Sequence, residues 1–309
     1  MKKVSWLAKM TERRCQEKKI FRRAKITEKK FNFREFRKNK LAALGSVLLA
    51  FLLFFAFFAP LLAPHDPLEQ KLDNRLENPS SEYPFGTDEL GRCLFSRVLY
   101  GARLSLGIGL LVVAVTSLFG TILGALSGYK GGVLDELIMR GVDVVMAFPN
   151  IIPALLLAGL LGSGTFNVVI ALILTQWPVY TRLVRGLTLS LKEMAFVEAA
   201  RALRASDLYI LRRHILPNCA GQVLVLGTLD IAHVIIFAAA LSFLGLGIQP
   251  PTPEWGSMLK AGVSYLRVAP QVSFFPGLMI MLTVFAFNFV GDGLRDCLGP
   301  EAENGVVLQ

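Results

Sequence analysis

Six long apolar stretches constrain the fold of this 309-residue chain more than any other feature of its sequence. A helix that crosses a hydrocarbon core of about 30 Å needs roughly 20 mostly apolar residues. The stretches that meet or approach this length are residues 41–63, 104–126, 144–161, 164–181, 219–248 and 269–290. Because a backbone in lipid must satisfy its own hydrogen bonds, we predict an all-α polytopic membrane protein with six transmembrane helices.

The composition agrees with this prediction, since 53% of the residues are hydrophobic and only 18% are charged. The first stretch follows a 40-residue leader, and both are too long for a cleaved signal peptide. We therefore expect residues 41–63 to remain as a transmembrane anchor. The non-membrane segments are too short for a separate soluble catalytic domain.

The distribution of Lys and Arg predicts the orientation of the chain, because these residues are enriched in cytoplasmic loops. With the amino terminus inside, the inner segments 1–40, 127–143, 182–218 and 291–309 carry 16, 2, 7 and 1 of them. The outer segments 64–103, 162–163 and 249–268 carry 5, 0 and 2. We therefore predict that both termini are cytoplasmic. The basic tail, residues 1–40, is expected to contact anionic lipid rather than nucleic acid.

The remaining divisions of the chain follow from these spans. Residues 64–103 form a predicted extracytoplasmic loop, in which Thr87 or Asp88 caps a short interfacial helix leading into the second span. Residues 104–296 form a predicted five-helix core, and residues 297–309 form a cytoplasmic tail. Of the four cysteines, only Cys93 falls on the outer side, so we expect no intramolecular disulfide.

The loop at residues 192–218 is charged and rich in helix-forming residues. We predict a helix over 196–205, an N-cap at Ser206 or Asp207, a second helix over 208–214, and an end at Pro217. Two interpretations compete for this hairpin. In the first, it lies on anionic lipid as an amphipathic element. In the second, it docks onto a cytoplasmic partner protein, and the small alanines of the hairpin favour this second interpretation.

Several polar residues fall within the apolar stretches, where they are costly and usually face a bundle interior or a water-filled cavity. Asp230 and His233 share a helix face in the fifth stretch. We consider three roles for them: an interhelical pair, the lining of a transport pathway, or catalysis by an intramembrane enzyme. Gln176 and Asn288 are further pathway candidates, with interhelical hydrogen bonding as the alternative. The sequence has no phosphate-binding loop, metal motif or nucleophile elbow.

The segment Glu198-Ala199-Ala200, with Ala205 and Ile215-Leu216-Pro217-Asn218, resembles the EAA loop of ABC-importer permeases. Further motifs resemble the second permease of dipeptide, oligopeptide and nickel importers. They are FGTDELGR at 85–92, GARLSL at 101–106, GY at 128–129, GG at 131–132, MR at 139–140, AFP at 147–149, LSFLGLG at 241–247, PTP at 251–253, WG at 255–256 and GDGLRD at 291–296. The resemblance covers about residues 35–300.

The resemblance implies the permease fold of type I ABC importers, in a bacterial or archaeal inner membrane. The implied ATPase-coupling residues are Glu198, Ala199, Ala200, Ala205, Ile215 and Pro217. The implied partners are a homologous permease chain in a heterodimer, two cytoplasmic ATPase subunits and an extracytoplasmic binding protein. ATP and Mg²⁺ would be used by the ATPases, so no cofactor is expected on this chain, which would be a transport subunit rather than an enzyme.

The sequence departs from the family pattern at three positions. Ala205 stands where the family favours a glycine that eases the turn between the two helices of the loop. Cys93 replaces an expected Asp, and Ala238 replaces a common Glu. These changes leave the permease interpretation intact but the substrate open: we expect di- or oligopeptides, with nickel or a nickel chelate as the alternative.

Overall fold

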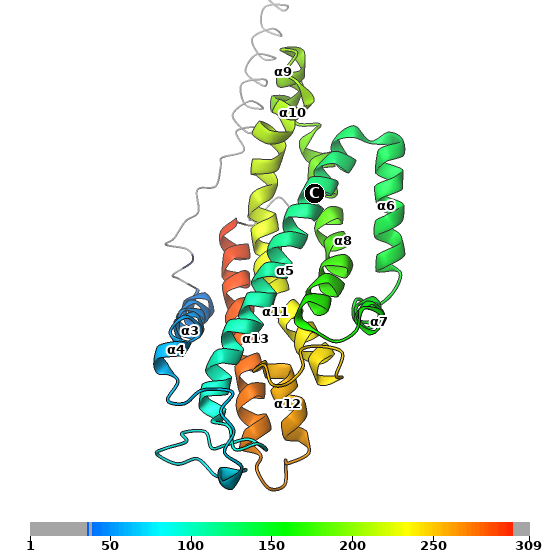
Figure 1. Cartoon of the computed structure of the whole chain (residues 1–309). Coiled ribbons are helices and arrows are strands. Elements are labelled where there is room, and N and C mark those ends of the chain that lie inside the picture. Colours follow the sequence, from blue (N-terminus) through cyan, green and yellow to red (C-terminus); the bar gives the residue numbers. More distant parts are fainter. Residues whose placement is uncertain (1–35, 37–38, 299–309) are drawn as a thin grey trace, which may run out of the picture.

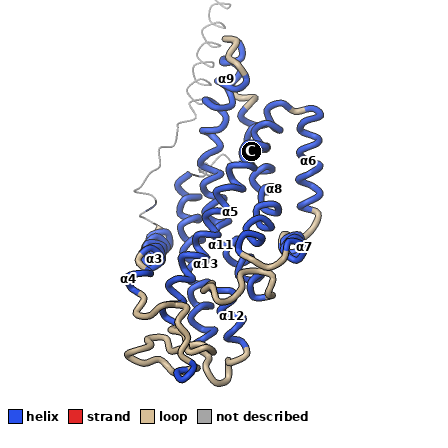
Figure 2. The backbone as a smooth tube through the Cα atoms, viewed as in Figure 1, coloured by secondary structure: helices blue, strands red, loops and turns tan. Residues whose placement is uncertain are grey.

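The computed structural model describes residue 36 and residues 39–298, and within this part of the chain the regular elements are helices (Figures 1 and 2). The predicted tails 1–40 and 297–309 lie almost wholly outside the described residues. The long helices are α3 (Lys40–Phe57), α5 (Leu94–Lys130), α6 (Gly132–Met146), α7 (Ile151–Leu161), α8 (Thr165–Leu191), α11 (Leu216–Phe243) and α13 (Gln271–Leu298). The short ones are α4 (Ala59–Leu62), η1 (Leu72–Asn74), α9 (Ala195–Ala202), α10 (Asp207–Ile210), η2 (Leu211–Ile215) and α12 (Trp255–Val263).

Five helices are long and apolar enough to cross a membrane, and a bent pair makes up to six. This result confirms the prediction of an all-α polytopic protein. The third stretch differs from a single straight span, because α6 and α7 meet at an angle of 87°. The break contains Pro149, which lacks an N–H donor and disfavours helical geometry in the residue before it.

Close contact between α5 and α8 forms the centre of the bundle (Figure 1). Three glycines spaced four residues apart on α5 make this contact possible. A methyl group on Gly120 would lie 2.6 Å from Cβ of Tyr180, and one on Gly124 would lie 2.5 Å from the carbonyl oxygen of Thr181. A methyl group on Gly128 would lie 2.8 Å from the carbonyl oxygen of Arg185. The small-residue face of α5 therefore sets the distance between the two helices.

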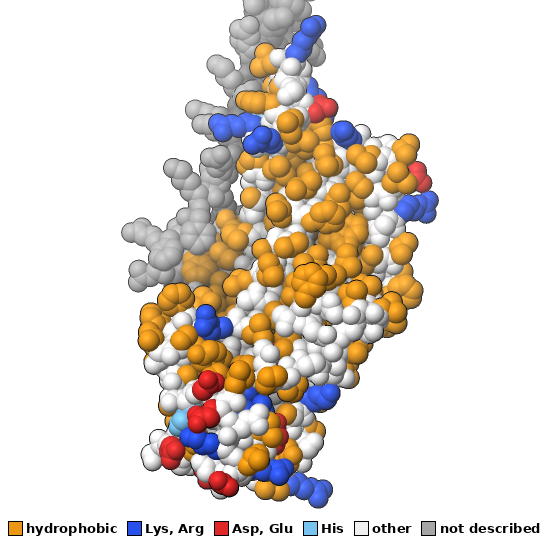
Figure 3. Space-filling view, in the orientation of Figure 1, with side chains coloured by type: hydrophobic (Ala, Val, Ile, Leu, Met, Phe, Trp, Pro, Cys, Tyr) orange, Lys and Arg blue, Asp and Glu red, His pale blue; other side chains and the backbone are white. Residues whose placement is uncertain are grey.

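The rest of the bundle is built outward from this pair. Helix α11 packs against α5 and α13, and α13 in turn packs against α3 at the margin of the molecule (Figure 1). Hydrophobic side chains cover much of the visible surface between the two ends, whereas charged side chains gather near the ends (Figure 3). This distribution is typical of a bundle that presents its middle to lipid.

The helix predicted to lead into the second span is the first part of α5 rather than a separate element. Helix α5 begins at Leu94 and continues without a break to Lys130, where Gly131 ends it at a φ of 67°. No proline interrupts this run, so the helix that begins outside the apolar stretch extends directly into it. Thr87 and Asp88 bond within the preceding loop, and Cys93 occupies the N-cap position without a side-chain bond.

Candidate functional site

The loop at residues 192–218 forms a helical hairpin that projects beyond the ends of the neighbouring helices (Figure 1). We call this end of the molecule the hairpin end, and the opposite end, with residues 64–93 and α12, the loop end. The first arm is α9, and the second begins with α10. The hairpin therefore extends along the bundle rather than across it.

The turn between the arms has the hydrogen bonds of a Schellman motif. The N–H of Arg204 donates to the carbonyl of Arg201 at 2.9 Å, and the N–H of Ala205 donates to the carbonyl of Ala200 at 3.1 Å. Arg204 has a φ of 58°, the left-handed conformation that normally favours glycine. The family pattern places the turn glycine at position 205. In the structure the residue with the left-handed backbone is Arg204, and Ala205 packs against the hairpin core.

The second arm also differs from the prediction. Ser206 caps α10 as expected, since its hydroxyl accepts the N–H of Tyr209 at 3.3 Å. The arm does not end at Pro217, however, because α10 continues through the wider turn η2 directly into α11. Pro217 lies just after η2 within this continuous helical run, and its missing N–H does not end the helix. The second arm and the fifth span thus form one helical element, Asp207–Phe243.

The predicted coupling residues fall into two groups. Ile215 is fully buried in an apolar cluster with Val197 of α9 and Val184 of α8, and Ala200 and Ala205 pack against this cluster. Glu198, Ala199 and Pro217 are exposed. Large apolar side chains on the hairpin surface are exposed as well: Met194, Leu203, Leu208 and Tyr209, with Leu203 at 84%. The hairpin thus has a buried base and an apolar tip that stays exposed in the part of the chain that the structure describes.

A side chain of α5 connects both arms of the hairpin to the bundle. The hydroxyl of Tyr129 donates to the carboxylate of Asp207 on the second arm at 2.9 Å. The guanidinium of Arg201, on the first arm, lies 5.2 Å from the centre of the Tyr129 ring. Nearby, Nζ of Lys192 donates to the carbonyl of Gly128 at 3.2 Å. The end of α5 is therefore attached to the hairpin on each side of its turn.

Ion pairs join α6 to α8 near the same end. Arg185 binds Asp135 through two hydrogen bonds of 2.6 and 2.7 Å, and the hydroxyl of Ser127 also donates to Asp135. Closer to the middle of the bundle, Arg182 binds Asp143 at 2.7 Å. The apolar pattern of the sequence did not indicate these pairs.

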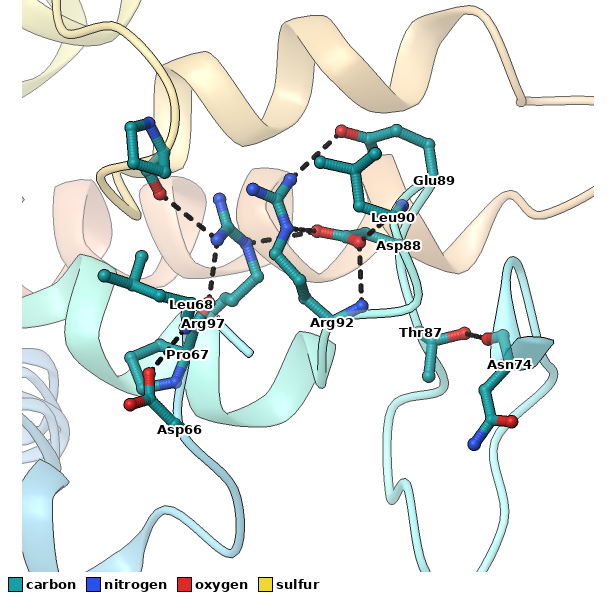
Figure 4. A network of polar contacts seen from close by, with 11 residues as sticks. Asp66, Pro67, Leu68, Asn74, Thr87, Asp88, Glu89, Leu90, Arg92 and Arg97 are labelled. Atoms are coloured by element: carbon teal, nitrogen blue, oxygen red, sulfur yellow. Dashed lines mark hydrogen bonds and ion pairs between the residues drawn. The ribbon is translucent and has the colours of Figure 1, made fainter. Parts of the chain in front are cut away.

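At the loop end, a buried ionic cluster holds several loops together (Figure 4). The carboxylate of Asp88 binds Nε of Arg92 at 2.7 Å and Nε of Arg97 at 3.2 Å. Arg97 also donates to the carbonyls of Pro67 and Pro251 at 2.9 and 3.3 Å. Arg92 bonds Glu89 at 3.1 Å, so two guanidinium groups face two carboxylates. This cluster positions the segments that begin α5 and precede α12.

Helix α12 completes the loop end. Its N-cap residue Glu254 is buried and accepts the N–H groups of Gly256 and Ser257 at 2.8 Å each. Burial raises the pKa of the Glu254 carboxyl above its ordinary value, and the two backbone donors partly oppose this effect. The indole of Trp255 donates to the carbonyl of Val98 at 3.1 Å, which fixes α12 on α5. Cys93, also at this end, is buried as a small free thiol.

Comparison with known families decides the identity of this bundle. Residues 120–304 match the model of the binding-protein-dependent transport system inner membrane component. Residues 32–79 match the N-terminal TM domain of oligopeptide transport permease C. The chain belongs to the binding-protein-dependent transport permeases. It is therefore a multi-pass inner membrane permease component of an ABC importer, a transport subunit rather than an enzyme.

Individual relatives support the same assignment. The permease is 43% identical over 272 residues to the dipeptide transport system permease protein DppC of Alkalihalophilus pseudofirmus, covering 88% of this chain and 90% of DppC. It is 45% identical over 273 residues to the glutathione transport system permease protein GsiD of Pectobacterium atrosepticum, covering 88% and 91%. A chain of the MetNI methionine ABC transporter in an inward-facing conformation shares the fold, with a TM-score of 0.52 and 16% identity, over 66% of this permease and 97% of that chain.

The polar candidates within the permease bundle do not form one site. Asp230 and Gln176 are buried, Asn288 is half-buried and His233 is exposed. The carboxylate of Asp230 accepts a hydrogen bond of 2.9 Å from the hydroxyl of Tyr180, which joins α11 to α8. No hydrogen bond between Asp230 and His233 is present in the described bundle. This arrangement favours the interhelical role for Asp230, and the pathway roles of all four residues stay predictions.

Three structurally important residues of the permease were not identified from the sequence. Tyr129 stood within the GY motif, yet only its position beside Arg201 and Asp207 shows what it contacts. Arg204 gave no signal, because an arginine is not expected in a left-handed conformation. Arg97 lies between two of the quoted motifs, and the sequence did not identify it as the residue that joins two distant loops.

Proposed function

We propose that this permease pairs with a homologous permease chain to import di- or oligopeptides, with two ATPase subunits at the hairpin end and a binding protein at the loop end. The observation that carries this proposal is the exposed apolar tip of a hairpin whose base is built into three membrane helices. In this proposal the hairpin end and both termini are cytoplasmic. ATP and Mg²⁺ are used by the ATPases, and this chain binds no cofactor.

The hairpin geometry favours docking over a position flat on lipid. A helix lying in the membrane interface would place its long axis across the bundle, whereas this hairpin continues beyond it (Figure 1). Leu203 and Leu208 are exposed, and no helix among the described residues covers them. Glu198 and Ala199 share the exposed surface with them. An apolar tip with a charged rim is suited to a groove on a partner protein.

Movement of the tip would reach the bundle by two routes. The second arm is continuous with α11, so displacement of α10 acts directly on the fifth span. The hydrogen bond from Tyr129 to Asp207 connects the same arm to α5, and the contact with Arg201 connects the first arm. Because the buried cluster around Ile215 keeps the hairpin base rigid, nucleotide-driven motion would shift the bundle between two discrete states.

The choice of substrate rests on the relatives, one named for dipeptide transport and one for glutathione transport. Both substrates are peptides with free ammonium and carboxylate groups. No cluster of three or more His, Cys, Asp or Glu side chains within the described residues is placed to hold a metal ion. Nickel, the alternative substrate, therefore gains no support from this chain.

Co-purification tests the docking proposal. The permease is co-expressed with its partner permease and ATPases, carrying Leu203→Asp or Glu198→Lys at the tip. Leu72→Asp, a substitution of another exposed leucine at the loop end, is the matched control. We expect the tip variants to lose the ATPases and dipeptide uptake while the control retains both. Full ATPase recovery with both tip variants would refute docking through the hairpin.

A further inference from the structure

The ion pair between Asp143 on α6 and Arg182 on α8 lies in an unusual environment. The two side chains are 2.7 Å apart, yet they remain 61% and 49% exposed on the surface of this chain. Asp143 directly precedes the uncharged stretch 144–161, and Arg182 directly follows the uncharged stretch 164–181. Charged groups at such positions are costly in lipid and normally face water or protein. The surface that carries this pair is therefore better suited to water or protein than to hydrocarbon.

The sequence of α6 extends the same surface toward the hairpin end. Glu136, Arg140 and Asp143 follow the i, i+4, i+7 spacing of one helix face, and all three are exposed. Val133, Leu137 and Val144 lie on the adjacent face, and they are exposed as well. Acidic and basic side chains are visible over α6 among hydrophobic ones (Figure 3). Helix α6 thus has one face suited to lipid and another suited to water.

A neighbouring ion pair is better placed than Asp143 and Arg182 to hold α6 on α8. Asp135 and Arg185 are more enclosed, with exposures of 18% and 31%, and they share two short hydrogen bonds. Asp143 and Arg182, in contrast, share one hydrogen bond, and neither makes another with the described residues. Exposed ion pairs contribute little to stability, so this pair can open at low cost.

We propose that this polar face of α6 and α8 lines the aqueous passage, and that Asp143 and Arg182 exchange their mutual ion pair for the terminal charges of a peptide. The planar guanidinium of Arg182 can bind a carboxylate through two parallel hydrogen bonds. The carboxylate of Asp143 can accept the terminal ammonium. A peptide carries both groups and so replaces both halves of the pair without leaving a charge unpaired. The inference rests on the peptide uptake proposed above.

Thiol labelling of the assembled importer in membranes tests the aqueous face. Single substitutions Asp143→Cys, Arg140→Cys and Val144→Cys are made with Cys15 changed to Ser, since Cys93, Cys219 and Cys297 are buried. A charged, membrane-impermeant maleimide applied to inside-out vesicles should modify the first two. Val144→Cys, exposed on the apolar face, should react at least about tenfold more slowly, because thiolates do not form in lipid. Equal, slow labelling at 143 and 144 would overturn the proposal, since it would place the pair against lipid or the partner permease.

Substrate protection tests the binding step in the same samples. Alanyl-alanine should slow the labelling of Asp143→Cys through its contact with Arg182, but not that of Arg140→Cys, one helical turn away. N-acetyl-alanyl-alanine amide, which lacks both terminal charges, should protect neither. In a separate assay, Arg182→Gln should lower alanyl-alanine uptake by about tenfold, the effect of one lost ionic contact. Labelling without protection would overturn the substrate contact.

ATPase recovery and peptide-stimulated ATP hydrolysis, measured alongside, distinguish this inference from the proposed function. If the ATPases co-purify and alanyl-alanine stimulates hydrolysis but gives no protection, the ion-pair site is wrong and the importer assignment stands. If neither alanyl-alanine nor glutathione stimulates hydrolysis by the assembled complex, the peptide assignment and this site fail together.

Discussion

Tyr129 donates a 2.9 Å hydrogen bond to Asp207, although the two residues are 78 positions apart in the sequence. This bond connects the end of α5 with the second arm of the hairpin, while Arg201 from the first arm covers the ring of Tyr129. Because α5 also forms the most extensive helix contact among the described residues, through its glycines against α8, Tyr129 connects the hairpin to the centre of the permease.

We expect Tyr129→Phe to weaken the coupling of ATP hydrolysis to uptake without releasing the ATPases. The substitution removes one hydrogen bond to a charged group, an interaction of roughly 1.5–3 kcal/mol, and keeps the ring beneath Arg201. Uptake per ATP hydrolysed should fall in proteoliposomes while ATPase co-purification is unchanged. Tyr100→Phe, at the loop end, is the control. A double-mutant cycle with Asp207→Asn should show non-additive effects, and strict additivity would contradict a direct connection.

The hairpin turn should respond oppositely to glycine at two neighbouring positions. Arg204→Gly should stabilise the turn by about 1 kcal/mol, because glycine adopts a positive φ without steric cost. Ala205→Gly should destabilise it, since it removes a methyl group that packs on the hairpin core. Amide hydrogen exchange across residues 195–210 in nanodiscs measures both effects. A stabilising Ala205→Gly together with a neutral Arg204→Gly would contradict the Schellman geometry.

Contact between α5 and α8 should not tolerate a larger side chain at the central glycine. We expect Gly124→Ala to cost about 1–3 kcal/mol, because the added methyl group would overlap the backbone of Thr181. Gly107→Ala is the matched control, since it lies on the same helix with no atom near its added methyl group. Thermal unfolding of the detergent-solubilised importer should separate the two variants. Equal stability would mean that the helices are further apart than in this structure.

The ionic cluster at the loop end should depend strongly on its central carboxylate. Asp88→Asn would remove the negative charge that balances the buried guanidinium groups of Arg92 and Arg97. We expect the free energy of unfolding to fall by about 3–5 kcal/mol. We expect faster proteolysis of the 64–93 segment and lower yield of folded protein. Asp73→Asn, an exposed change in the same segment, should have no such effect. Equal protease resistance of the two variants would show that Asp88 does not hold the loops.

Much of the fold was predictable because hydropathy is a local property of the sequence. A long apolar run can form a membrane-spanning helix that satisfies its own backbone hydrogen bonds, independently of the other helices. The spans could therefore be recognised one at a time. Their ends were less predictable, because α8 continues past Arg182 to Leu191 and α5 begins ten residues before the apolar stretch at 104. A helix does not end where its polarity changes unless a residue such as Gly131 or Pro149 ends it.

The membrane class, the spans and the position of the hairpin could be predicted from the amino-acid sequence, because these depend on composition and short motifs. The partners and the exposure of the polar groups became visible only in the packed helices. Asp230 bonds to Tyr180 rather than to the nearby His233, and Asp143 is exposed while Asp135 is enclosed. These outcomes depend on how helices distant in the sequence pack and rotate against each other. A one-dimensional pattern does not contain that information, since the energy of a buried charge is set by the partner that it meets.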